Sequence, residues 1–197
     1  MNHSLNTLYP IFLKMSNLRI LIVGAGEVAK EKLHFLLKSS PDSQVTVIAP
    51  DISSEIVDLF SSSKYQINII RKPFYPEILE KFNLVVAATN LPVLNEEVYL
   101  AAKEKGILIN VADTPELCDF YMGSIVTKGD LKIAISTNGK SPTFAKRFRQ
   151  LLEQILPDNI EELLPNLHQL RSKLQLNFSE KVNYLNEVTK ALIEDKK

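Results

Sequence analysis

Some residue types and patterns that mark whole classes of protein are scarce in this chain of 197 residues. Its single cysteine, Cys118, excludes an intrachain disulfide framework and cannot by itself build a zinc or iron–sulfur site. Neither sign of charge dominates, because 23 Lys and Arg residues balance 23 Asp and Glu residues. We therefore expect neither a nucleic-acid binder nor a membrane binder that works by bulk charge.

Long apolar runs are missing as well. No stretch approaches the roughly 18 apolar residues that a membrane-spanning helix needs. The first 16 residues lack the basic segment followed by an apolar one that marks a secretion signal. The three histidines have no second ligand at metal-binding spacing, so no metal site is predicted. With 45% hydrophobic and 23% charged residues, the composition predicts a soluble cytoplasmic protein with a sizeable core.

The first half of the chain alternates between strand and helix patterns. Five runs rich in Val and Ile predict buried parallel strands. These runs are Arg19–Val23, Gln44–Ala49, Gln66–Ile70, Leu84–Ala88 and Ile107–Ala112. Segments of helical spacing separate the runs. The third, from Pro76 to Phe82, is short, and the fourth, from Leu94 to Lys105, is stopped by Gly106. This alternation is typical of an α/β fold with a doubly wound, Rossmann-like parallel sheet.

The pattern changes after the fifth run. Two short strand-like runs on either side of Gly129 and Asp130 predict a hairpin. A polar loop follows, then an amphipathic helix that begins at Pro142 and ends at Pro157, and then a helix-rich tail. We expect three parts: a Rossmann domain at residues 1–113, a dimerisation and substrate segment at 114–157, and a helical tail at 158–197.

A glycine loop joins the first strand to the first helix. The sequence Gly24-Ala25-Gly26-Glu-Val-Ala29 has the GxGxxA pattern. Gly24 permits a tight turn, Gly26 lets the backbone approach a pyrophosphate, and the small Ala29 lets the helix pack on the strand. Phosphates would lie on the unpaired N–H groups of the helix N-terminus. The loop therefore predicts a dinucleotide site.

A missing cation indicates which dinucleotide binds. No Arg or Lys occurs between Lys38 and Lys64, so a 2′-phosphate would find no positive charge on the second strand or in the loop after it. This favours NAD over NADP. Asp51 follows the second strand, but later than the acid that usually binds the ribose, so its contact with the ribose stays undecided.

Polar residues also follow the fourth and fifth strands. Thr89 and Asn90 would either reach the nicotinamide half of the cofactor or cap the next helix. Asp113 places a carboxylate beside the cofactor, where it could accept a proton. The sequence Asp113-Thr-Pro115 is also a good turn and helix-cap signal, so spacing alone does not decide its role.

Five motifs occur in the order and spacing of a known family. They are Tyr9-Pro-Ile-Phe-Leu13, Ile22-Val-Gly24-Ala-Gly26-Glu-Val-Ala29, Ala87-Ala-Thr89-Asn90, Asn110-Val-Ala-Asp113 and Ser136-Thr-Asn-Gly-Lys-Ser-Pro142. On these residues the chain resembles precorrin-2 dehydrogenase of the siroheme-synthase type, over nearly all of residues 8–160. The tail beyond them is similar only in being helical.

The resemblance implies an NAD-dependent enzyme that oxidises precorrin-2 to sirohydrochlorin in siroheme biosynthesis. Asp113 falls on the family's catalytic aspartate, which implies a general base that takes a proton as hydride leaves the macrocycle. Glu27, Val28, Ala49 and Pro50 would line the NAD site. The resemblance also implies a homodimer with an interlocked middle region and, in some members, insertion of ferrous iron to give siroheme.

The substrate of this family carries several carboxylates, and a basic stretch of the chain could bind them. From Lys140 to Gln150 there are four positive residues and no negative ones. Backbone N–H groups near the start of this stretch could also hold a carboxylate. The residues expected to contact the substrate are Asn138, Gly139, Lys140 and Ser141. A solvated helix face is the other interpretation of the cations beyond them.

Two further functions stay possible at this point. The same pocket could also insert ferrous iron, because one aspartate could serve both reactions and no dedicated iron ligand is visible. Alternatively, the chain could be a non-catalytic NAD-sensing module that regulates a partner through its helical tail. That module would bind NAD without oxidising a tetrapyrrole. Cys118 is more typical of a small buried side chain than of a nucleophile.

Overall fold

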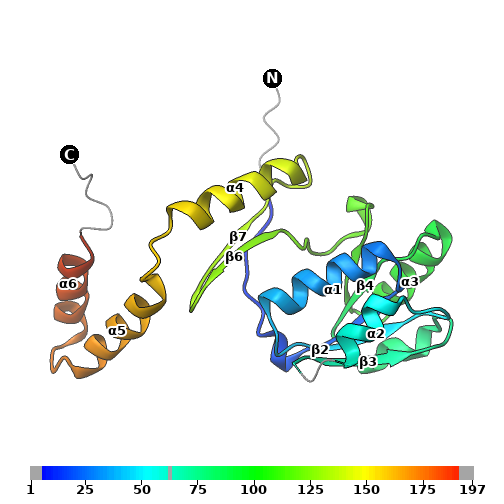
Figure 1. Cartoon of the computed structure of the whole chain (residues 1–197), viewed down its shortest axis with the longest axis horizontal. Coiled ribbons are helices and arrows are strands. Elements are labelled where there is room, and N and C mark those ends of the chain that lie inside the picture. The colour runs from blue at the N-terminus through cyan, green and yellow to red at the C-terminus, as the bar shows by residue number, and fades with distance from the viewer. Residues whose placement is uncertain (1–5, 62–63, 191–197) are drawn as a thin grey trace. The chain divides into compact units, whose positions relative to one another are not determined.

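A computed structural model describes residues 6–61 and 64–190 of the chain (Figure 1). Three short 3₁₀ turns, Met15–Asn17, Pro76–Lys81 and Pro115–Leu117, accompany the strands and α-helices. Along the chain these are β1 (Arg19–Val23), α1 (Glu27–Ser39), β2 (Gln44–Ile48), α2 (Ser54–Ser61), β3 (Gln66–Ile70), β4 (Leu84–Ala87), α3 (Pro92–Glu104), β5 (Leu108–Val111), β6 (Ser124–Lys128), β7 (Leu131–Ile135), α4 (Pro142–Ile155), α5 (Ile160–Lys173) and α6 (Phe178–Thr189).

The sheet of the first unit is parallel, with strand order β3-β2-β1-β4-β5. Alternate residues of β1 point to opposite faces of the sheet, as the strand period requires. Ile20 and Ile22 pack with residues of α1 and α2, whereas Leu21 and Val23 pack with residues of α3 and the Pro76–Lys81 turn. Both faces are therefore covered, which explains the continuous Val and Ile runs and confirms the predicted doubly wound fold.

The strand order places a topological switch point at β1. The chain moves outward from β1 to β2 and β3, then returns to β4 on the other side of β1. Ile22 pairs with Val47 on one side and with Val86 on the other. Ligands of open α/β sheets bind beyond the carboxyl ends of the strands at such a point. The glycine loop after β1 and the polar residues after β4 therefore flank the expected binding site.

Helix bounds follow local signals in the sequence. Ala29, Leu33 and Leu37, four residues apart, form the fully buried face of α1. The predicted stop of α3 is confirmed at Gly106, which has a φ of 66° and donates its N–H to the Lys103 carbonyl at 3.2 Å. The segment predicted as a short helix from Pro76 is a 3₁₀ turn in the structure.

The second unit consists of Ser124–Ile135 and the chain from Pro142 on, whereas Ser136–Ser141 belongs with the first unit. Its hairpin is antiparallel, as predicted, with Gly129 at a φ of 54° in the turn. Lys128 of β6 donates to the Leu156 carbonyl and pairs with Asp158, both at 2.9 Å, which ties the hairpin to the end of α4. The predicted boundaries at residues 113 and 157 stay predictions.

Within residues 6–61 and 64–190, none of the helices has the length and apolar character required to cross a membrane. Across the same ranges, no group of three His, Cys, Asp or Glu side chains gathers in a way that could hold a metal ion.

Candidate dinucleotide and catalytic site

Gly24 closes the turn between β1 and α1. Its φ is +106°, a left-handed value that favours glycine. Its N–H donates to the Ile48 carbonyl at 2.9 Å, and a Cβ at this position would lie 2.6 Å from the Ala88 carbonyl oxygen. The turn therefore packs between the ends of β2 and β4, and no larger residue fits there without moving the backbone.

The start of α1 offers backbone donors in open space. Gly26 is the exposed N-cap, and a Cβ added to it would meet no atom within 4 Å. The first hydrogen bond of the helix runs from the Lys30 N–H to the Gly26 carbonyl at 2.9 Å. The N–H groups before it have no acceptor within the helix, which suits an anion. Ala25, between the two glycines of the loop, is buried. The loop therefore fits the pyrophosphate of a dinucleotide.

Other predicted cofactor residues lie at the same edge of the sheet, because they follow parallel strands that end side by side. Glu27 and Val28 are exposed in the first turn of α1. Ala49 is buried and extends the β2–β3 ladder by donating its N–H to the Ile70 carbonyl at 3.2 Å. Pro50, next along the chain, is exposed at the rim.

Thr89 fastens the end of β4 to the start of α3. Its hydroxyl donates to the Asn95 side-chain oxygen at 2.7 Å, and the Asn95 amide donates back to the Thr89 carbonyl at 3.1 Å. The buried Asn95 of α3 was not among the site residues predicted from the sequence. These bonds hold Thr89 to α3 but do not cap the helix, whose N-cap Leu91 has no side-chain cap hydrogen bond. Both interpretations of Thr89 therefore stay predictions, and Asn90 is exposed at the rim.

Asp113 is an exposed residue in the turn after β5, with a φ of 58°. Within the described ranges, no hydrogen bond or ion pair engages its carboxylate. Among the described residues, Asp113 and Asn138 are the non-glycine residues with positive φ, and both are predicted site residues. Left-handed backbone costs about 1 kcal/mol or more, and Asp and Asn tolerate it best. The fold therefore holds both residues in a conformation that local preference disfavours.

A thiol organises the segment around Asp113. The Cys118 sulfur accepts the Val111 N–H at 3.3 Å and donates to the Val111 carbonyl at 3.2 Å. The buried Asn110 side chain donates to the Phe120 carbonyl at 2.9 Å, while Asp119 accepts the Ile109 N–H at 3.1 Å. Burial raises the pKa of the Cys118 thiol, so it is protonated at neutral pH and serves structure rather than nucleophilic attack.

The predicted substrate residues form a compact polar turn before α4. The Asn138 N–H donates to the Ser136 hydroxyl at 3.2 Å, and the Ser141 N–H donates to the Thr137 hydroxyl at 3.1 Å. Gly139 has a φ of 74°, and the Lys140 N–H donates to the Thr137 carbonyl at 3.1 Å. The turn leaves Gly139 and Lys140 exposed.

Two of the basic residues of α4 bond to their own helix. Arg149 forms an ion pair with Glu153, and Arg147 donates to the Gln150 side chain at 3.1 Å. These contacts agree with a solvated helix face, which was the second interpretation of the cations beyond the turn.

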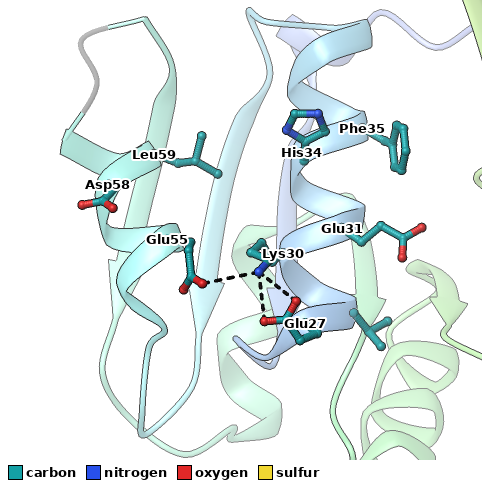
Figure 2. Close-up of a pocket in the computed structure, with 9 residues that line it drawn as sticks. Glu27, Lys30, Glu31, His34, Phe35, Glu55, Asp58 and Leu59 are labelled. Atoms are coloured by element: carbon teal, nitrogen blue, oxygen red, sulfur yellow. Dashed lines mark hydrogen bonds and ion pairs between the residues drawn. The ribbon is translucent and has the colours of Figure 1, made fainter.

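A hollow of about 760 Å³ opens between α1 and α2 and begins at Glu27 and Val28 (Figure 2). Lys30 reaches from α1 between two carboxylates there. It pairs with Glu27 at 2.8 Å and with Glu55 of α2 at 3.5 Å. This cluster was not predicted from the sequence, because its members come from separate helices.

Comparison with known proteins agrees with this geometry. Residues 11–124 match a family described as "Putative NAD(P)-binding". Residues 128–155 match a second family, described as "Sirohaem biosynthesis protein central". A solved structure, SirC, precorrin-2 dehydrogenase, superposes with a TM-score of 0.75 and 26% sequence identity, and covers 96% of this chain and 91% of its own.

The curated relatives include siroheme synthases. The enzyme of Pseudoalteromonas translucida is 36% identical over 169 residues, which is 86% of this chain and 35% of the relative. Siroheme synthase 2 of Yersinia pestis is 38% identical over 154 residues, or 78% of this chain and 32% of the relative. The chain thus spans about a third of the length of these relatives. These matches confirm the resemblance and the nicotinamide cofactor expected from the motifs. The chain belongs to the NAD(P)-binding family that residues 11–124 match, and its residues 128–155 match the central segment of sirohaem biosynthesis proteins.

Proposed function

We propose that this chain is an NAD-dependent precorrin-2 dehydrogenase, which forms sirohydrochlorin for siroheme biosynthesis in the cytoplasm. The observation that carries the proposal is the likeness, over nearly the whole chain, to SirC, precorrin-2 dehydrogenase. The glycine loop supports it, because it lies at the switch point of the sheet and presents backbone donors in open space.

The chain's own residues would divide the work. Backbone N–H groups at the start of α1 bind the pyrophosphate, and the turn at Gly24 keeps the loop close to the sheet. NAD held by this loop would supply the acceptor for the hydride that the macrocycle loses. The carboxylate of Asp113 takes the accompanying proton and releases it to water, so that precorrin-2 and NAD⁺ give sirohydrochlorin, NADH and a proton. An exposed carboxylate that has no partner among the described residues suits this role.

The polar turn is the proposed substrate contact. The residues are Asn138, Gly139, Lys140 and Ser141, and the N–H groups of all but Gly139 are engaged within the turn. The proposed contact therefore rests on the Gly139 backbone and on the charge of Lys140, which suit the carboxylates of a tetrapyrrole. The turn belongs to the same structural unit as Asp113. Thr89 and Asn90 keep their proposed place near the nicotinamide half of the cofactor, with Thr89 held by Asn95.

We propose that the active form is a homodimer. On α4, Phe144, Leu151 and Ile155 are 59%, 47% and 63% exposed, at the spacing of one helix face. In the segment before β1, Tyr9 and Phe12 are 87% and 68% exposed. Contiguous apolar side chains on a protein surface mark interaction sites, and a second copy of the chain would cover them.

An anaerobic assay tests the proposed reaction. Purified protein is mixed with enzymatically made precorrin-2 and NAD, and the absorbance of NADH is followed together with the spectrum of sirohydrochlorin. We expect both to rise in parallel. NAD binding without turnover would contradict the enzyme and favour the sensing module. Ferrous iron added at the end decides whether the chain also inserts iron, because only an iron-inserting enzyme then gives a siroheme spectrum faster than a protein-free control.

A further inference from the structure

The hollow between α1 and α2 continues from the proposed cofactor site. Glu27 and Val28 line it at the first turn of α1, and Glu55 lines it from the first turn of α2. Helix α2 follows the loop after β2, and folds of this class bind the adenine-side ribose at the end of that strand. In Figure 2 the Lys30 side chain lies between Glu27 and Glu55. A dinucleotide bound in this way would bring its ribose 2′ position, where NAD and NADP differ, near this cluster.

The lining of the hollow is strongly acidic. Among its lining residues, all of which the structure describes, Lys30 is the sole Lys or Arg. Four carboxylates line the same hollow, and two of them contact Lys30. The four belong to Glu27, Glu31, Glu55 and Asp58. A phosphate group that entered this hollow would meet net negative charge, and Lys30 is the cation it would need.

Lys30 is already engaged by two of these carboxylates. The Nζ atom lies 2.8 Å from Glu27 and 3.5 Å from Glu55. The hydrogen bond with Glu27 raises the pKa of Lys30 above its ordinary value, and the charges of both carboxylates add to this. A backbone hydrogen bond and the charge of Lys30 lower the pKa of Glu55. Both partners are therefore charged at neutral pH, and the ammonium is shared before any ligand arrives.

We propose that Glu55 is a specificity-determining residue that makes the site prefer NAD to NADP by withholding Lys30 from a 2′-phosphate. This inference rests on the proposed NAD cofactor. A 2′-phosphate must compete for the ammonium with Glu55 at 3.5 Å as well as with Glu27 at 2.8 Å, while it lies beside the remaining carboxylates. A 2′-hydroxyl carries no charge and meets no such penalty. The preference for NAD therefore has two sources. Lys30 is already paired with carboxylates, and no Arg or Lys occurs between Lys38 and Lys64.

Direct binding measurements on the full chain test the proposal without the chemical reaction. Dissociation constants for NADH and NADPH are determined by nucleotide fluorescence for the wild type, Glu55→Gln and the double variant Glu55→Gln with Lys30→Met. Glu55→Gln keeps the size of the side chain and removes its charge. We expect the ratio of NADPH to NADH affinity to rise about threefold in Glu55→Gln, because Lys30 loses one of its two carboxylate partners and keeps Glu27. The double variant should lose this gain, because it lacks the cation.

Asp58→Asn is the matched control. Asp58 lines the same hollow, and its carboxylate is not a partner of Lys30 in the structure. It should keep the wild-type ratio. An equal gain in Asp58→Asn would overturn the proposal, since the effect would then be general charge rather than release of Lys30. An unchanged ratio in Glu55→Gln, with NADH still bound, would overturn this inference alone. A wild type that binds neither nucleotide would overturn the proposed cofactor as well.

Discussion

Two glycines of one motif have different physical tasks. Gly24 has a left-handed backbone, and a Cβ there would lie 2.6 Å from the Ala88 carbonyl oxygen. Gly26 has an ordinary φ of −87°, and a Cβ there would meet no protein atom within 4 Å. The fold therefore requires Gly24 to be glycine. At Gly26 the need would come from the proposed ligand, because a Cβ would occupy the space where a pyrophosphate would approach the backbone.

Alanine substitutions separate these tasks. We expect Gly24→Ala to lower the free energy of unfolding by about 3 kcal/mol, because it combines backbone strain with a steric clash. Gly26→Ala should change stability by less than about 1 kcal/mol while weakening NAD binding about tenfold or more. Urea unfolding and NADH titration measure the two quantities. A Gly26→Ala protein that binds NADH as tightly as the wild type would argue against a pyrophosphate at this loop.

The turn after β5 shows how an element beyond the sheet is held. The Cys118 thiol bonds to both backbone groups of Val111, and Asp119 bonds to Ile109 two residues earlier in the strand. Asp119 also pairs with Lys103 of α3 at 2.7 Å. The turn that carries Asp113 is therefore fastened to β5 by side chains that follow it in the sequence.

The raised pKa of Cys118 predicts a pH-dependent contribution to stability. Burial holds the thiol protonated in the folded protein, so the unfolded chain loses this proton first as pH rises. Above the ordinary thiol pKa of about 8.5, the unfolded state then binds fewer protons and stability falls. Cys118→Ser does not titrate in this range. We expect the difference in unfolding free energy between the wild type and Cys118→Ser to shift against the wild type as pH rises from about 7 to about 10. A constant difference would contradict a buried, protonated thiol.

Regular elements were predictable, because their signals are local. Val and Ile runs predicted all five strands of the sheet to within about a residue at each end, and Gly106 marked the end of α3. The polar residues after strands β4 and β5 were also placed at one sheet edge, since parallel strands end together.

Side-chain partners were not predictable from local pattern. Asn95 bonds to Thr89 from the second turn of α3, and Cys118 bonds to Val111 across a turn. Glu55 contacts Lys30 because α1 and α2, which β2 separates in the sequence, lie side by side on the sheet. Each contact depends on tertiary packing. Hence the role of Thr89 could not be chosen in advance, and the cluster around Lys30 had no sequence signal.

Exposed apolar surface on α4 links the single chain to the proposed dimer. Phe144 and Phe148 stack with ring centroids 5.8 Å apart, and both are exposed together with Leu151 and Ile155. Helix α4 nevertheless buries Ala145 in the described structure, so one of its faces is already used. The other face has the character of an interface, with aromatic and aliphatic side chains in one row.

A charge placed in that row should dissociate the dimer. We expect the double variant Leu151→Glu with Ile155→Glu to sediment as a monomer where the wild type sediments as a dimer, because two charges would be buried without partners. Lys146→Glu, at an exposed position of the same helix, is the control and should stay dimeric. Analytical ultracentrifugation at micromolar concentration measures this. A wild type that is monomeric would contradict the proposed homodimer.

The central claim is that Asp113, held at the carboxyl edge of an NAD-binding sheet, takes the proton when precorrin-2 is oxidised. The most direct measurement is a single anaerobic turnover with wild type and Asp113→Asn, each first shown to bind NADH. Asn keeps the shape and tolerates the φ of 58°, but it cannot accept the proton. We expect the two proteins to bind NADH equally, and we expect Asp113→Asn to form sirohydrochlorin at least about a hundredfold more slowly than the wild type. A rate in Asp113→Asn close to that of the wild type would contradict the central claim.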